Sequence, residues 1–188
     1  AGAGVVLREP TVDHAVLEVA RGGILRRGLG FDECDVGILL NVDADLIGTD
    51  GVETLEELAL VKSTVVEVVR SSGVAVLNAD DPTVVELTER AGGAVIYFSM
   101  DSENATVREH LEAGGTAVVL EGGDVVIRSR KPDVRALAAL NAPITLQGVA
   151  TFNTANVLAA VAALHGLGIP AQVIRNGIST FHPSASQN

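Results

Sequence analysis

The sequence predicts an α/β fold with a doubly wound, mostly parallel sheet. Three apolar runs end alike, each on a polar side chain, at residues 15–18, 36–41 and 74–78. Buried parallel strands are typically continuous apolar runs of this kind, and helical stretches between them supply the crossovers. Ligands of open α/β sheets bind beyond the carboxyl ends of the strands. We therefore expect Glu18, Asn41 and Asn78 to share one edge of the sheet.

Local signals predict the remaining elements in order. Thr54 and Glu57 form a capping box for a helix over 55–69, because the threonine hydroxyl can accept a free N–H of the first turn. Asp80-Asp81-Pro82 indicates a helix over 83–90, since acids and an early proline suit a helix start. The further expected elements are a strand at 94–98, hairpin strands at 116–120 and 124–128, a strand or loop at 143–146, and helices at 153–165 and 170–180.

Length and composition predict one domain. The 188 residues, 47% of them hydrophobic, suffice for one sizeable core. We expect a central domain over 1–180, with 101–131 as a small antiparallel β appendage, and the start of a linker to a further C-terminal domain over 181–188. The single cysteine, Cys34, cannot form an internal disulfide, which favours a reducing cytoplasm.

Charge and hydropathy exclude two classes of partner. The formal net charge of −11 and a pI of about 4.7 oppose a phosphate backbone, so no nucleic-acid binding is expected. The apolar stretch at 157–169 is too short to span a bilayer and contains His165, so no membrane anchor is expected either. Association into a homo-oligomer is left open.

Lys62 interrupts the apolar face of the predicted 55–69 helix. Its neighbours on that face include Leu58, Ala59, Val65 and Val66. A buried ammonium is costly unless it is paired or neutralised, so Lys62 extends its amine to water, pairs with a carboxylate, or takes part in chemistry. Spacing alone favours the first two interpretations, because lysine stems bury readily while their amines stay hydrated.

Four other polar residues are candidates for ligand binding. Glu18 would follow an apolar strand, where a carboxylate can bind Mg²⁺, although pairing with Arg21 is the simpler interpretation. Arg21 and the two glycines after it would let a backbone approach an anion. Asn153 and Asn156 would share one helix face, where an amide can recognise an adenine edge, but N-capping explains Asn153 about as well.

The usual phosphate-binding loop is absent from these residues. The pattern Gly-x-x-x-x-Gly-Lys-Ser/Thr, whose backbone cradles the phosphates of a nucleotide, does not occur.

Five motifs follow one another along the chain: Glu18-Val19-Ala20-Arg21-Gly22-Gly23-Ile24-Leu25-Arg26, Asp35-Val36-Gly37 to Asn41-Val42-x-x-Asp45, Val61-Lys62-Ser63, Leu77-Asn78-Ala79-Asp80-Asp81-Pro82, and Phe152-Asn153-x-x-Asn156. Their order resembles the central, ATP-binding domain of the Mur ligase family, over nearly the whole chain. It is most similar to the cyanophycin-synthetase branch, in which a stretch like residues 18–26 is distinctive. The resemblance implies a topology of the P-loop type, here without the P-loop itself.

The resemblance implies an ATP- and Mg²⁺-dependent amide ligase, in which ATP phosphorylates a carboxylate and an amine attacks the acyl phosphate. In this branch the reaction joins arginine to aspartate side chains of a poly-aspartate backbone. By position, Glu18 would bind magnesium and Lys62 would be carbamylated to hold a second magnesium. Asn156 would contact adenine, while Asn41 and Asp45 would shape the loop on the metal side.

Two departures from the family pattern affect the expected activity. Leu46 stands where the family usually has a histidine, and Val19 stands where threonine is typical. The phosphate-binding loop should precede residue 1, and a C-terminal domain should follow the region of residues 181–183. Without both, stabilisation of the transferring phosphoryl group is incomplete, so we expect no turnover by this chain alone.

Two other interpretations stay open at this point. In the first of them, the chain would be a non-catalytic domain that keeps the fold for assembly or nucleotide sensing. Leu46 and the missing phosphate loop motivate this interpretation. A folylpolyglutamate-type ligase of the same family is the third interpretation, and the Arg21-Gly22-Gly23 stretch argues against it.

Overall fold

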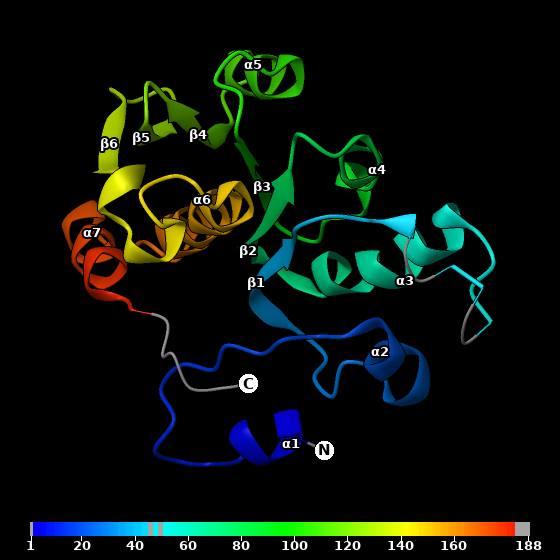
Figure 1. Ribbon diagram of the computed structural model, residues 1–188. Helices are drawn as coiled ribbons and strands as arrows, with labels where there is room; N and C mark the ends of the chain where they lie inside the picture. Colours follow the sequence, from blue (N-terminus) through cyan, green and yellow to red (C-terminus); the bar gives the residue numbers. More distant parts are fainter. Residues whose placement is uncertain (1, 45–46, 49–50, 183–188) are drawn as a thin grey trace.

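The computed structural model is an α/β fold built on one six-stranded sheet (Figure 1), and it describes residues 2–44, 47–48 and 51–182. The strands lie side by side in sequence order: β1 (Cys34–Leu39), β2 (Val69–Asn78), β3 (Ala94–Ser99), β4 (Thr116–Glu121), β5 (Asp124–Arg128) and β6 (Val134–Ala138). Strands β1 to β4 pair in parallel, whereas β5 and β6 continue the sheet as antiparallel neighbours. The predicted mostly parallel sheet is confirmed.

Helices cover both faces of the sheet, as the doubly wound prediction requires. The helices α3 (Leu55–Glu67), α4 (Pro82–Glu86) and α5 (Ala105–Glu112) lie on one face, and α6 (Thr151–Gly166) and α7 (Ala171–Thr180) lie on the other. Side chains of β2 alternate between the two cores: Val74 and Val76 pack toward α6, whereas Ala75 and Leu77 pack toward α3. The shorter helices are α1 (Gly2–Val6), α2 (Arg21–Arg27), η2 (Thr88–Arg90), η3 (Ala139–Asn141) and η4 (Pro143–Thr145).

The strand predicted at residues 15–18 is wrong. This segment is irregular, and Val16 is 99% exposed. A parallel strand needs a paired neighbour and cover on both faces, and this segment has neither among the described residues. Strand β1 therefore forms the edge of the described sheet, with Ile38 and Leu40 partly exposed.

The start of α3 follows the predicted capping box. The Glu57 N–H donates to the Thr54 hydroxyl at 3.1 Å, and the Thr54 N–H donates to the Glu57 carboxylate at 3.3 Å. The helix ends at Glu67 instead of Val69, because Val69 already pairs with Cys34 as the first residue of β2.

Between residues 101 and 145 the structure is richer than predicted. The hairpin of β4 and β5 is confirmed, and it extends the main sheet because β4 pairs in parallel with β3. Helix α5, which Asn104 caps by accepting the Val107 N–H at 3.2 Å, and strand β6 were missed. Residues 143–145 form the short helix η4.

His165, in the last turn of α6, should make the stability of the fold depend on pH. Burial lowers the pKa of His165, and the positive charge of Lys131 lowers it further. An unfolded histidine has a pKa of about 6.5. Since the folded state binds this proton less tightly, its contribution is present above that value and is lost as the pH falls through the folded pKa. The free energy of unfolding of His165→Gln, from urea denaturation, should therefore fall less steeply than that of wild type between about pH 7 and pH 5.

The exposed His14 provides the control for this measurement. His14→Gln makes the same substitution at this exposed position, so its profile shows what the loss of a histidine does without burial. Parallel profiles for His165→Gln and wild type would show that His165 does not cause the loss of stability in acid.

Candidate functional site

The segment that leaves β1, residues 40–42, is held by side chains from three other elements; we call it the β1 exit. The Lys62 amine, from α3, donates to the Asn41 carbonyl at 2.8 Å. The Asn78 side-chain amide, at the end of β2, donates to the Leu40 carbonyl at 2.8 Å. The Asp81 carboxylate, before α4, accepts the Val42 N–H at 2.8 Å. The prediction that Asn41 and Asn78 share one edge is therefore confirmed, and Lys62 joins them. Glu18 does not end a strand of this sheet, because it lies in the irregular segment before α2.

A second polar cluster lies beside the β1 exit, at the ends of β2 and β3. The Asp80 carboxylate accepts hydrogen bonds from the Ser99 hydroxyl at 2.5 Å, the Met100 N–H at 2.7 Å and the Asn104 amide at 3.1 Å. These contacts join β2, β3 and the start of α5. The sequence indicated Asp80 only as part of a helix start. Its contacts between strands were not predicted, because their partners lie about 20 positions away along the chain.

The first turn of α6 lies at the same edge of the sheet. Strand β6 is antiparallel to β5, which is antiparallel to β4, so β6 runs in the direction of the parallel strands and ends at their carboxyl edge. The chain then passes through η3 and η4 into α6, whose last residue, Gly166, packs against Val74 near the opposite edge. The carboxyl edge is thus flanked by α3 on one face and by the start of α6 on the other.

The two predicted adenine-binding asparagines occupy different environments. The Asn153 amide donates to the Ile144 carbonyl at 2.8 Å, so it fastens η4 to α6. Asn156 is exposed and lines a hollow of about 280 Å³ between α6, α7 and η4. The other residues of this hollow are mostly apolar: Ile144, Val157, Ala160, Gly177, Ile178 and Phe181. One amide in an apolar hollow suits a flat, partly polar ring.

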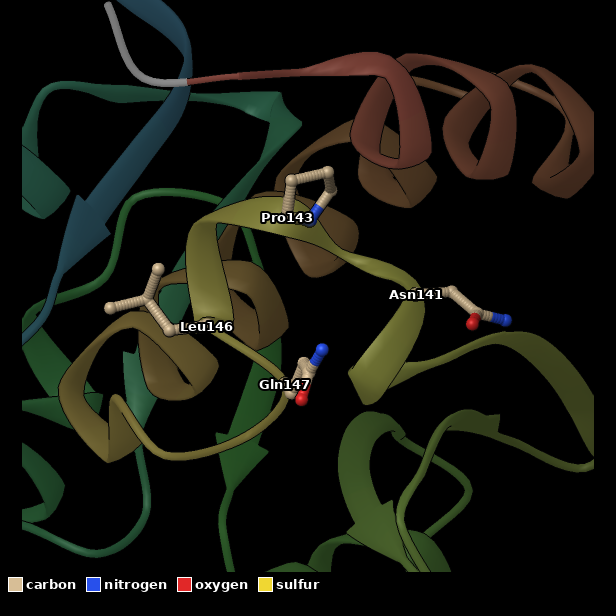
Figure 2. Close-up of a pocket in the computed structure, with 4 residues that line it drawn as sticks. All are labelled: Asn141, Pro143, Leu146 and Gln147. Carbon is tan, nitrogen blue, oxygen red and sulfur yellow. The ribbon is translucent and has the colours of Figure 1, made fainter. Parts of the chain in front are cut away.

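A second hollow lies in the loop between β6 and α6 (Figure 2). It measures about 460 Å³ and is lined by Asn141, Pro143, Leu146 and Gln147. Leu146 and Gln147 have φ values of 50° and 61°, a left-handed conformation that non-glycine residues adopt at a cost of about 1 to 3 kcal/mol each. The buried Thr145 hydroxyl stabilises this turn by accepting the Gly148 N–H at 3.2 Å. No sequence signal revealed this turn, because glycine normally marks such positions.

The remaining predicted ligands lie in the segment that leads into α2. Glu18 is exposed and makes no hydrogen bond or ion pair with any residue that the structure describes. Arg21 is the first residue of α2, a helix that packs against α3, the helix of Lys62. No described contact joins Glu18 to Lys62, so their shared metal site stays a prediction. Asp45 and Leu46 lie outside the described residues.

Cys34 does not belong to this site. It begins β1, at the opposite end of the strand from Asn41. Burial raises the pKa of its thiol, and the positive charge of Arg70 only partly offsets this. A protonated thiol is a poor nucleophile, so the local environment gives Cys34 no catalytic activation.

Comparison with known proteins identifies the family. The Mur ligase middle domain matches residues 5–164. The chain belongs to the Mur ligase family. It is 48% identical over 185 residues to cyanophycin synthetases of Crocosphaera subtropica and of a Synechocystis species, and the match covers 98% of this chain but 21% of each relative. The chain therefore spans about a fifth of these relatives.

More distant relatives within the Mur ligase family agree with this assignment. A UDP-N-acetylmuramoylalanine--D-glutamate ligase of Desulfitobacterium hafniense is 32% identical over 147 residues, which are 78% of this chain and 29% of the relative. The crystal structure of MurF from Acinetobacter baumannii matches with a TM-score of 0.52 at 18% identity, over 80% of this chain and 29% of that one. This structural similarity supports the fold. Within the described residues, no helix is long and apolar enough to cross a membrane.

Proposed function

We propose that this chain is the central domain of an ATP-dependent amide ligase of the cyanophycin-synthetase type. In the longer enzyme, ATP would phosphorylate a carboxylate to an acyl phosphate with release of ADP, and the amine of an amino acid such as arginine would attack the acyl phosphate with release of phosphate. The observation that carries the proposal is the meeting of Lys62, Asn41 and Asn78 at the carboxyl edge, where the start of α6 presents Asn156 beside an apolar hollow.

The lining of the hollow at Asn156 supports the binding of a purine there. Its apolar residues can pack against the faces of the ring, and the amide of Asn156 can donate to and accept from the ring edge. Asn153 would act indirectly, since its amide fixes η4 against α6. Arg21, at the start of α2, would supply positive charge for a phosphate.

The chemistry of Glu18 and of a carbamate at Lys62 supports magnesium as the bound ion. Magnesium typically keeps several waters and binds one or two carboxylates together with substrate phosphates. The exposed Glu18 carboxylate is not engaged by any described residue, so it is available as one ligand. Lys62 as an amine offers no ligand, but its carbamate would offer oxygen ligands. Bound magnesium would neutralise the charge that develops on the transferring phosphoryl group.

The test is ADP release by a longer ligase that includes this chain. Release should require both a carboxylate and an amine, with poly-aspartate and arginine as the first pair to assay. Release of ADP without either substrate would contradict the proposal. For the 188-residue chain alone we expect no turnover.

Asn156 gives the proposal a sharper test in the same enzyme. Asn156→Leu should raise the Kd for ATP by up to about tenfold, the value of one lost hydrogen bond, as measured by calorimetry with magnesium present. The control is Gln172→Leu, which also replaces a side-chain amide by leucine, on the exposed surface of α7. Unchanged ATP affinity in Asn156→Leu would show that the purine does not bind in this hollow.

One observation favours a second candidate function, a non-catalytic domain for nucleotide binding or assembly. The Lys62 amine contacts the protein's own Asn41 carbonyl, as a purely structural lysine would. Retention of ligase turnover after loss of Lys62 would favour this alternative.

A further inference from the structure

Lys62 and Asp81 hold opposite ends of one peptide unit. The Asn41 carbonyl and the Val42 N–H belong to the same planar peptide group and point in opposite directions. Lys62 donates to the carbonyl end at 2.8 Å, and Asp81 accepts from the N–H end at 2.8 Å. A carboxylate and an ammonium are thus connected through a single backbone amide. Because the charges align with the dipole of the peptide, each hydrogen bond strengthens the other.

Asp81 is itself fixed by a second set of contacts. Its other carboxylate oxygen accepts the N–H groups of Thr83 at 2.9 Å and Val84 at 3.3 Å, which caps α4. The carboxylate therefore links the start of α4 to the β1 exit, 39 residues earlier in the chain. Its oxygens are engaged by backbone N–H groups, so Asp81 is arranged to position a backbone segment.

Asn78 fixes the neighbouring peptide unit in the same way. Its amide donates to the Leu40 carbonyl at 2.8 Å, while its side-chain oxygen accepts the Asp80 N–H at 2.9 Å. Together, Asn78 and Asp81 hold the two consecutive peptide groups of the β1 exit. The direction of the Asn41 carbonyl, and with it the position of the Lys62 amine, is set by these two side chains.

We infer that Asn78 and Asp81 are positioning residues for Lys62 in the ligase reaction. The effect on turnover rests on the proposed function. The chain of hydrogen bonds from Asp81 through the peptide group of Asn41 and Val42 to Lys62, which we call the linkage, is independent of that function. Both residues act through the backbone of the β1 exit and need not touch substrate. Partners that orient a functional group in this way typically contribute about 10- to 100-fold to activity.

Asp81→Asn separates positioning from helix capping. Asparagine caps a helix as well as aspartate does, so α4 keeps its N-cap. The remaining side-chain nitrogen is a donor and cannot accept the Val42 N–H. In the longer ligase we expect kcat to fall about 10- to 100-fold, with the KM for ATP changed less than about twofold. Asp81→Ser is the second variant, because serine also caps helices but offers only one oxygen.

The matched control is Glu67→Gln, the same change of carboxylate to amide at the far end of α3, where Glu67 pairs with Arg90 at 2.6 Å. A general loss of stability would lower Tm similarly in both variants, whereas only Asp81→Asn should lower kcat. In the 188-residue chain, the Val42 amide should exchange its hydrogen faster in Asp81→Asn and at the wild-type rate in Glu67→Gln.

The outcomes distinguish failure of this inference from failure of the proposed function. Wild-type protection of the Val42 amide in Asp81→Asn would overturn the linkage. Wild-type kcat in Asp81→Asn, in an enzyme that loses turnover without Lys62, would overturn the positioning function alone. Turnover that survives the loss of Lys62 would overturn the proposed function and leave the exchange result as the test of the linkage.

Discussion

Lys62→Ala is expected to lower kcat of a longer ligase that includes this chain by about 10²- to 10³-fold, the range seen when one electrostatic contributor to a transition state is removed. The proposed carbamate of Lys62 would hold a magnesium ion against the transferring phosphoryl group, and alanine offers no oxygen in its place. Steady-state ADP release, measured at saturating ATP, carboxylate and amine, gives kcat directly. The Lys62 amine already lies at the carboxyl edge, 2.8 Å from the Asn41 carbonyl, so the loss should be local.

Lys62→Arg decides whether the side chain acts as an anion or as a cation. Arginine keeps the positive charge and the donors for the Asn41 carbonyl, but its guanidinium stays protonated and cannot be carbamylated. If Lys62 works as a carbamate, Lys62→Arg should be as inactive as Lys62→Ala, and a small added carboxylate should partly restore Lys62→Ala. Wild-type turnover by Lys62→Arg would exclude the carbamate. Carbon-13 bicarbonate should also label the active wild-type protein at Lys62.

The parts of the fold that were predictable are those encoded by local signals. The capping box at Thr54 and the acids before Pro82 each satisfy free N–H groups of the helix that follows, and both helices begin where predicted, to within one residue. Helix α5 and strand β6 gave weaker signals. Because Val107 is the one residue of α5 that is buried, the sequence of this helix shows little of an apolar face. The place of β6 depends on its antiparallel pairing with β5, which the residues of β6 alone do not encode.

The strand predicted at residues 15–18 shows where local reasoning fails. An apolar run specifies a strand only if a neighbouring strand and a covering layer are present, and both are long-range properties. Val16 is almost fully exposed, so the apolar character of this run predicted burial that no described residue provides.

The candidate site was predictable as a location but not as a set of contacts. Polar residues after apolar strands indicated the carboxyl edge, and there Asn78 does contact the segment of Asn41, through the Leu40 carbonyl, whereas Glu18 does not end a strand. The contact between Asp81 and Val42 could not be predicted, because Asp81 also has a sufficient local explanation as the N-cap of α4. For Lys62, the contact with Asn41 agrees with the simpler interpretation of a lysine that extends its amine, and carbamylation stays a prediction.

Gly37→Ala is expected to lower the free energy of unfolding by about 3 kcal/mol, at the upper end of the usual cost of overpacking a core. Gly37 lies in β1 under α3, and an added Cβ would stand 2.4 Å from the Val65 carbonyl oxygen and 2.8 Å from a methyl group of Val69. The first of these atoms is backbone, so a side-chain rotation cannot relieve the clash and α3 itself has to move. Urea denaturation followed by circular dichroism measures the loss.

Gly4→Ala is the control, because a Cβ at Gly4 would meet no atom within 4 Å. It should leave the stability unchanged or raise it by up to about 1 kcal/mol, because alanine is the better helix former at this position of α1. Equal stability of Gly37→Ala and wild type would show that α3 does not pack this closely on β1.

Val65 lies one turn from Lys62 on α3, so a shift that relieves the clash also moves the Lys62 amine relative to the β1 exit. Gly37→Ala should therefore weaken the protection of the Val42 amide even under conditions where the protein stays folded, which connects the packing of α3 to the geometry of the site.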